Sequence, residues 1–132
     1  MRTLYLDSSA VLKFIFAEPE SVAAKKEISG VLYSSELVRV EVVRAVLRIE
    51  PELIERALAV LSKIRIIKIK SAILVQAERL PNHVRIRGMD AIHLASANTL
   101  GRLGQTIVTY DKNMAKAALG LGYKVESPGA NL

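Results

Sequence analysis

The sequence predicts an α/β domain in which a parallel sheet is covered by helices on both faces. Two observations lead to this prediction. Short apolar segments that suit strands alternate along the chain with longer segments of helical pattern, which is typical of βαβ units. The 132 residues are enough for one hydrophobic core and too few for two ordinary domains. We therefore expect one domain spanning residues 1–132.

The first half of the chain carries clear start and stop signals. Pro19 suits the first turn of a helix, and Gly30 ends the helical pattern that follows. Ser34 or Ser35 can cap the next helix, and Pro51 begins another. The elements expected here are strands at Thr3–Leu6 and Val31–Tyr33 and helices at Ala10–Phe16, Pro19–Ile28, Ser35–Ile49 and Leu53–Ile64.

The second half continues the alternation. Ile64–Ile69 is rich in β-branched residues, which favours a strand, and Ser71 can cap the helix after it. Pro81–Gly88 is polar and basic, as expected of a loop. The remaining elements expected are helices at Ser71–Leu80, Asp90–Gly101 and Lys112–Leu119 and strands at Thr106–Thr109 and Tyr123–Val125.

Composition limits the possible classes of protein. The chain has no cysteine, which excludes disulfides and thiolate metal sites. No apolar run is long enough to span a membrane, and the N-terminal apolar run is too short for a signal peptide, so we expect a cytoplasmic protein. The net charge of +6 is compatible with a nucleic-acid partner, although a soluble basic surface would explain it equally well.

The three aspartates are the most informative residues for function. Asp7 and Asp111 each follow an apolar strand, and Asp90 opens a helix. Ligands of open α/β sheets bind beyond the carboxyl ends of the strands, which is where Asp7 and Asp111 lie. Each has an alternative explanation as a helix cap or a first-turn residue, and that explanation is weakest for Asp7. We expect the three to share one site.

A fourth acidic residue breaks the pattern of its helix. Glu41 falls within an apolar stripe, where the alternative explanation is an ion pair with Arg44 three residues on. Clustered carboxylates repel one another, and a divalent ion relieves this; all-oxygen ligands suit Mg²⁺ or Mn²⁺. Hydroxyls at Ser8, Ser9 or Thr109 could support such a site. His93 could bond to Asp90, but a structural role is favoured.

Four segments together resemble the PIN domain, and within it the VapC toxins of prokaryotic toxin–antitoxin pairs. They occur in the expected order and cover nearly the whole chain: Leu4–Ala10 (LYLDSSA), Leu37–Ala45 (LVRVEVVRA), Gly88–Ala97 (GMDAIHLASA) and Val108–Asp111 (VTYD). The resemblance implies a three-layer α/β/α sandwich around a mainly parallel twisted sheet. It also implies a Mg²⁺- or Mn²⁺-dependent endoribonuclease.

The same resemblance assigns roles to particular residues. It implies that Asp7, Glu41, Asp90 and Asp111 bind the metal and carry catalysis, with Ser9 and Thr109 as supporting hydroxyls. Some relatives have a further acidic residue shortly after the last aspartate, where this chain has Asn113. The resemblance further implies a homodimer and a VapB-type antitoxin partner that blocks the acidic pocket.

We therefore expect a metal-dependent ribonuclease in which positive charge near the pocket attracts RNA phosphates. The candidate RNA contacts are Arg85, Arg87 and Lys112. Two other functions remain open. One is a phosphatase or phosphotransferase with Asp7 as nucleophile, although no second aspartate follows two residues later. The other is a non-catalytic binding module whose acidic pocket receives a partner's Arg or Lys.

Overall fold

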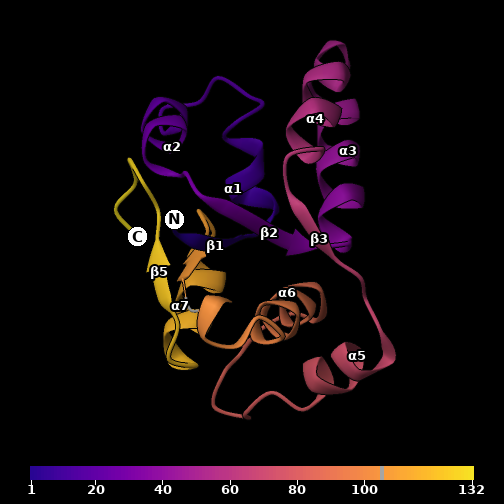
Figure 1. Cartoon of the computed structure of the whole chain (residues 1–132), viewed down its shortest axis with the longest axis vertical. Helices are drawn as coiled ribbons and strands as arrows, with labels where there is room; N and C mark the ends of the chain where they lie inside the picture. Colours follow the sequence, from indigo (N-terminus) through magenta and orange to yellow (C-terminus); the bar gives the residue numbers. More distant parts are fainter. Residues whose placement is uncertain (105) are drawn as a thin grey trace.

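A computed structural model describes residues 1–104 and 106–132 (Figure 1). Strands and helices alternate as the sequence predicts. The strands are β1 (Thr3–Leu6), β2 (Val31–Ser35), β3 (Arg65–Ile67), β4 (Thr106–Val108) and β5 (Lys124–Glu126). The helices are α1 (Ser8–Leu12), α2 (Ser21–Glu27), α3 (Leu37–Ile49), α4 (Ile54–Leu61), α5 (Ser71–Glu78), α6 (Gly88–Asn98) and α7 (Lys112–Gly120), with 3-10 turns at Pro51–Leu53 and Gly101–Gly104.

The five strands form one sheet in the order β3-β2-β1-β4-β5, and every neighbouring pair is parallel. Successive strands add outward from β1 through β2 to β3, and the chain then returns to the other side of β1 with β4. The order of the strands therefore reverses between β1 and β4. Parallel α/β sheets bind ligands at such a reversal, beyond the carboxyl ends of the two strands.

Side chains of the central strands alternate between two cores, one on each face of the sheet. Leu4, Leu6 and Val108 pack into a core shared with α1, α2, α3 and α4, whereas Tyr5 and Ile107 pack into a second core with α6 and α7. Figure 1 shows these helix groups on opposite sides of the sheet, with α5 beside α6. Both faces of β1 and β4 are thus buried, which explains their continuous apolar sequences. The expected α/β/α sandwich is confirmed.

Several element ends differ from the sequence prediction, and one difference matters for function. Helix α1 begins at Ser8 and not at Ala10, because the Asp7 side chain accepts a hydrogen bond from the Ala10 N–H and caps it. Ser71 is the first residue of α5 and not its cap. Helix α6 begins at Gly88, so Asp90 lies within its first turn.

Two glycines allow close approaches between segments. Gly30 has φ +128°, and a Cβ atom there would lie 2.3 Å from the Arg2 carbonyl oxygen, so any side chain would disrupt the start of the β1–β2 pairing. Gly129, with φ +82°, brings the C-terminal segment against Glu20 and Ala23 at the start of α2. Among the described residues, no helix has the length and apolar composition needed to cross a membrane.

Candidate active site

The candidate site lies where the strand order reverses. Asp7 directly follows β1, and Thr109 to Asp111 follow β4, its parallel neighbour. The Asp7 N–H donates to the carbonyl of Val108, which ties the two strand ends together. Glu41 reaches the same region from α3, and Asp90 from the first turn of α6. The fold therefore brings the four acidic residues, distant in sequence, to one edge of the sheet.

Asp7 is held by three donors at the bottom of this site. Its Oδ1 atom accepts from the Ser9 hydroxyl at 2.6 Å and from the Ala10 N–H at 3.1 Å, and its Oδ2 atom accepts from the Thr109 hydroxyl at 2.5 Å. The residue is only 4% exposed. A carboxylate can accept about four hydrogen bonds or metal contacts, so about one acceptor position on Asp7 stays open.

The protonation of Asp7 reflects a balance between burial and these donors. Burial raises its pKa above the ordinary value, whereas the hydrogen bonds from Ser9 and Thr109 oppose the rise. Ser9 also accepts from the Tyr110 N–H at 2.8 Å, and Thr109 accepts from the Asp111 N–H at 3.1 Å. The two hydroxyls expected from the sequence thus link Asp7 to the backbone that follows β4.

Glu41 is positioned by a buried histidine. Its Oε1 atom lies 2.6 Å from Nε2 of His93, whose Nδ1 lies 2.7 Å from the Tyr5 hydroxyl. His93 is 1% exposed and Tyr5 is fully buried. The Tyr5 oxygen already accepts the N–H of Ser35 at 3.0 Å, and burial raises the pKa of Tyr5, so its proton is available for Nδ1. A neutral His93 then carries its proton on Nε2 and donates it to Glu41.

Asp90 shows most directly that the carboxylates converge. Burial raises its pKa, and the charges of Asp111, Asp7 and Glu41 raise it further. Asp7, Glu41 and Asp111 therefore each lie close enough to Asp90 for their charges to act on it. Asp111 is exposed and its Oδ1 caps α7 by accepting the Met114 N–H at 2.9 Å. Asp7 and Asp111 are therefore both helix caps and members of the cluster.

The donor chemistry of this cluster fits a hard divalent ion. All four candidate ligands are carboxylates, and their mutual repulsion gives a cation a favourable place to bind. One acceptor position remains on Asp7, and within residues 1–104 and 106–132 the Oε2 atom of Glu41 has no hydrogen-bond donor. No three Asp, Glu or His side chains in the described part of the chain already stand at ligand distances from one point. Binding would therefore require adjustment of the exposed Asp111 and the half-buried Asp90.

The other candidates from the sequence occupy different positions. Arg85, Arg87 and Lys112 are exposed; Arg87 directly precedes α6 and Lys112 follows Asp111. Glu41 pairs with His93 and does not make the alternative ion pair with Arg44. His93 bonds to Glu41 and Tyr5, not to Asp90 as its spacing allowed.

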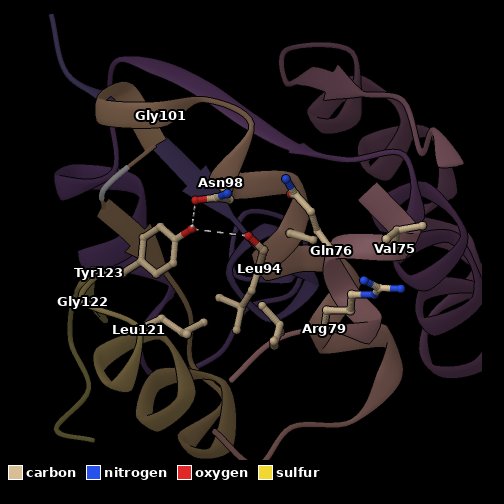
Figure 2. Close-up of a pocket in the computed structure, with 11 residues that line it drawn as sticks. Val75, Gln76, Arg79, Leu94, Asn98, Gly101, Leu121, Gly122 and Tyr123 are labelled. Atoms are coloured by element: carbon tan, nitrogen blue, oxygen red, sulfur yellow. Dashed lines mark hydrogen bonds between the residues drawn. The ribbon is translucent and has the colours of Figure 1, made fainter. Parts of the chain in front are cut away.

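A cavity of about 620 Å³ lies apart from the carboxylates, and none of the four lines it. Figure 2 shows it between α5, with Gln76 and Arg79, and Tyr123 on the opposite wall. The Tyr123 hydroxyl lies 3.4 Å from the Asn98 side-chain oxygen and 3.5 Å from the Leu94 carbonyl oxygen. Because this cavity lacks the acidic groups, size alone does not identify the reactive site.

Sequence reasoning missed the roles of Tyr5 and His93. Tyr5 looked like an ordinary strand residue, and His93 was assigned a structural place without its partners. The usable signal was the run Asp90-Ala91-Ile92-His93-Leu94, in which a histidine falls on the buried side of a short helix among small and apolar residues. A buried imidazole requires hydrogen-bond partners, and Glu41, which falls within an apolar stripe, was a candidate beside Asp90.

Comparisons with known proteins agree with this geometry. Residues 4–119 match the PIN domain family. Ribonuclease VapC35 of Mycobacterium tuberculosis is 34% identical over 134 residues, covering 96% of this chain and 97% of that protein. Ribonuclease VapC46 of the same organism is 35% identical over 130 residues, covering 97% and 99%.

Solved structures share the fold. A toxin–antitoxin complex from Klebsiella pneumoniae contains a chain that superposes with a TM-score of 0.74 at 19% identity, covering 98% of this chain and 99% of that one. M. tuberculosis VapC20, a toxin that cleaves the sarcin–ricin loop, gives a TM-score of 0.70 at 16% identity, covering 86% and 94%. The chain therefore belongs to the PIN-domain family, among the VapC ribonucleases.

Proposed function

We propose that this chain is an endoribonuclease that uses Mg²⁺ or Mn²⁺ to hydrolyse RNA phosphodiester bonds, as the toxin of a type II toxin–antitoxin pair. The observation that best supports the proposal is that Asp7 and Asp111 follow β1 and β4, where the strand order reverses. In addition, the pKa of Asp90 is raised by burial and then by the charges of Asp111, Asp7 and Glu41, as expected if the four carboxylates are neighbours. The relatives named as VapC ribonucleases, matched over almost their full length, support RNA as the substrate.

The four carboxylates would hold one or two ions. When bound, such an ion polarises a phosphoryl oxygen and lowers the pKa of a water molecule, which is the chemistry that phosphodiester hydrolysis needs. Asn113 stands where some relatives carry a further acidic ligand, so this chain would rely on the four carboxylates alone.

The remaining residues of the site would orient these ligands and the substrate. Ser9 and Thr109 fix the carboxylate plane of Asp7 and leave one acceptor position open. His93 holds one oxygen of Glu41 and leaves the other available. The exposed side chains of Arg85, Arg87 and Lys112 would contact phosphates on either side of the scissile bond, because a polyanion approaches an acidic pocket only with nearby positive charge.

The proposal extends to partners and location. One structural neighbour is part of a toxin–antitoxin complex, which supports a VapB-type antitoxin as the partner of this chain. A basic antitoxin side chain inserted among the four carboxylates would neutralise them and exclude a metal ion. We also propose a homodimer that acts in the cytoplasm, where its RNA substrate would lie.

The geometry disfavours the phosphatase alternative. Asp7 is 4% exposed and three donors hold its carboxyl group, which leaves one acceptor position for a metal ion but keeps the carboxyl group from moving onto a phosphorus atom. A non-catalytic binding module would use the same acidic pocket without turnover. The two readings differ in one measurable property, which is cleavage that depends on a divalent ion.

The test is an RNA cleavage assay with purified protein and structured RNA, with added Mn²⁺ or with EDTA. We expect cleavage by the wild-type protein only with the ion, and loss of cleavage in Asp7→Asn. Glu36→Gln is the matched control, since Glu36 is exposed at the start of α3 and lies outside the cluster. Cleavage in EDTA, or equal cleavage by Asp7→Asn, would overturn the proposal; tight antitoxin binding without any cleavage would favour the binding module.

A further inference from the structure

A second hollow, of about 310 Å³, opens beside the acidic cluster on the outer face of α3. Its lining comes from two helices: Val40, Glu41, Arg44, Ala45 and Arg48 from α3, and Met89 from α6. Glu41 is a candidate metal ligand and Met89 directly precedes Asp90, so the hollow adjoins the site from the outside. A molecule bound in it would approach the reactive carboxylates.

The hollow carries positive charge, in contrast to the acidic site beside it. Arg44 and Arg48 are exposed, and neither makes an ion pair or side-chain hydrogen bond with any residue that the structure describes. They lie four residues apart on α3, which places them on one face and about 6 Å apart along the helix axis. Two guanidinium groups that follow one face of α3 beside the four carboxylates are suited to bind a long anion, one part of which lies at the acidic site.

The same hollow also offers apolar surface. Val40 is 56% exposed and Met89 is 50% exposed, and they flank the charged residues. Phosphates of single-stranded RNA contact guanidinium groups in charge-assisted hydrogen bonds, and the face of an unpaired base can cover the exposed apolar side chains of Val40 and Met89. An RNA that is cut at the carboxylates must pass close to Glu41, which lines the hollow, so two arginines at that place with no carboxylate partner among the described residues favour RNA as the occupant.

We propose that the α3 hollow, lined by Val40, Arg44, Arg48 and Met89, binds the RNA strand that leads into the active site, with Arg44 and Arg48 contacting successive phosphates. The inference rests on the proposed ribonuclease function and adds a substrate path that the sequence did not indicate. The basic residues expected from the sequence lie on the loop before α6 and at the start of α7, whereas this path runs along α3.

The experiment measures RNA affinity as a function of salt concentration. A fluorescent single-stranded RNA of mixed sequence is titrated in EDTA, so that binding is separated from cleavage. For single strands each phosphate contact contributes about 0.7 to the slope of log affinity against log salt, or roughly fivefold in affinity at about 0.1 M salt. We expect Arg44→Ala/Arg48→Ala to lower the slope by about 1.4 and to weaken binding roughly 25-fold.

The control removes the same charge elsewhere. Arg39→Ala/Lys26→Ala also lowers the net charge by two, but Arg39 lies about 180° around α3 from Arg48, and Lys26 lies on α2. Both positions are exposed, so folding should be unaffected. We expect this control to change affinity and slope much less than the Arg44/Arg48 pair.

The outcomes separate the two proposals. Equal effects of both double variants would overturn the RNA path and leave only general electrostatic attraction. Unchanged RNA binding with weakened antitoxin binding in Arg44→Ala/Arg48→Ala would assign the hollow to a protein partner and also overturn the inference. In both cases Mn²⁺-dependent cleavage that is lost in Asp7→Asn would leave the proposed function intact. If the wild-type protein neither bound nor cleaved RNA, both proposals would fall together.

Discussion

Replacing Thr109 with valine removes a single hydroxyl that supports Asp7 and keeps the shape of the side chain. The Thr109 hydroxyl donates to Oδ2 of Asp7 at 2.5 Å, and the residue is fully buried. Water cannot replace the lost donor without opening the site. The Asp7 carboxylate would keep its hydrogen bonds from Ser9 and Ala10 on Oδ1. The variant should therefore fold, with one donor fewer to Asp7.

The size of the effect follows from burial. A hydrogen bond to a charged group contributes about 1.5–3 kcal/mol to stability. We therefore expect Thr109→Val to lower the free energy of unfolding by about 2 kcal/mol near neutral pH. The hydrogen bond lowers the pKa of Asp7, so its removal raises that pKa further. A carboxyl whose folded pKa exceeds its unfolded pKa holds its proton more tightly in the folded state, so stability falls as pH rises through that window. The cost of Thr109→Val should therefore be larger near neutral pH than at acidic pH.

Urea unfolding in EDTA at several values between about pH 4 and pH 8 measures this cost. Thr109→Ser should recover most of the lost stability because it restores the hydroxyl. Thr3→Val is the matched control, since Thr3 lies at the start of β1 away from Asp7. A decrease in the free energy of unfolding below about 0.5 kcal/mol, or one independent of pH, would refute the reasoning. A buried charged acceptor that loses its donor should destabilise the fold by more than this.

Three further predictions test other parts of the structure. Tyr5→Phe removes the hydroxyl that donates to Nδ1 of His93 and accepts from the Ser35 N–H. We expect the free energy of unfolding in urea to fall by about 2–4 kcal/mol and Mn²⁺ binding, measured by calorimetry, to weaken. Wild-type values for both would contradict the hydrogen bonds assigned to Tyr5. Asp90→Asn removes a repelled carboxylate, so its melting temperature in EDTA should exceed that of the wild type, by a margin that grows as pH rises above about 4. An equal margin at every pH would argue against the shared charge. Gly30→Ala should destabilise the fold by about 2 kcal/mol or more, because its φ is positive and the new Cβ meets the Arg2 carbonyl; an effect under about 0.5 kcal/mol would show that this approach is not tight.

The fold was predictable because its strands and helices are dictated by local patterns. Leu4–Leu6 and Ile107–Val108 have apolar residues at successive positions, which is expected of strands that are covered on both faces, and both are strands in the structure. Element ends were less predictable. A structural explanation was considered weakest for Asp7, yet its side chain caps α1, which begins at Ser8.

The acidic cluster was predictable for a different reason. A carboxylate is costly in a core, so Glu41 within an apolar stripe and Asp7 after a strand were conspicuous in the sequence alone. The partners that position them were not, because a hydroxyl or an imidazole fits many environments. Only the paired strands place Thr109 against Asp7, and only the packing of α6 on the sheet places His93 between Tyr5 and Glu41.

The α3 hollow was beyond the reach of sequence reasoning. Arg44 could be considered only as an intrahelical partner for Glu41, since sequence spacing relates residues within one helix. The hollow exists because the first turn of α6 brings Met89 to the outer face of α3, and that contact joins segments more than forty residues apart. Such a surface is a property of tertiary packing.

We infer that the four carboxylates share one divalent-ion site, and calorimetric titration with Mn²⁺ is the direct test. The wild-type protein should bind Mn²⁺, and binding should weaken in each of four variants that remove one charge, while Glu36→Gln should bind as the wild type does. The four variants are Asp7→Asn, Glu41→Gln, Asp90→Asn and Asp111→Asn. No binding by the wild-type protein, or equal binding by all four variants, would contradict the claim.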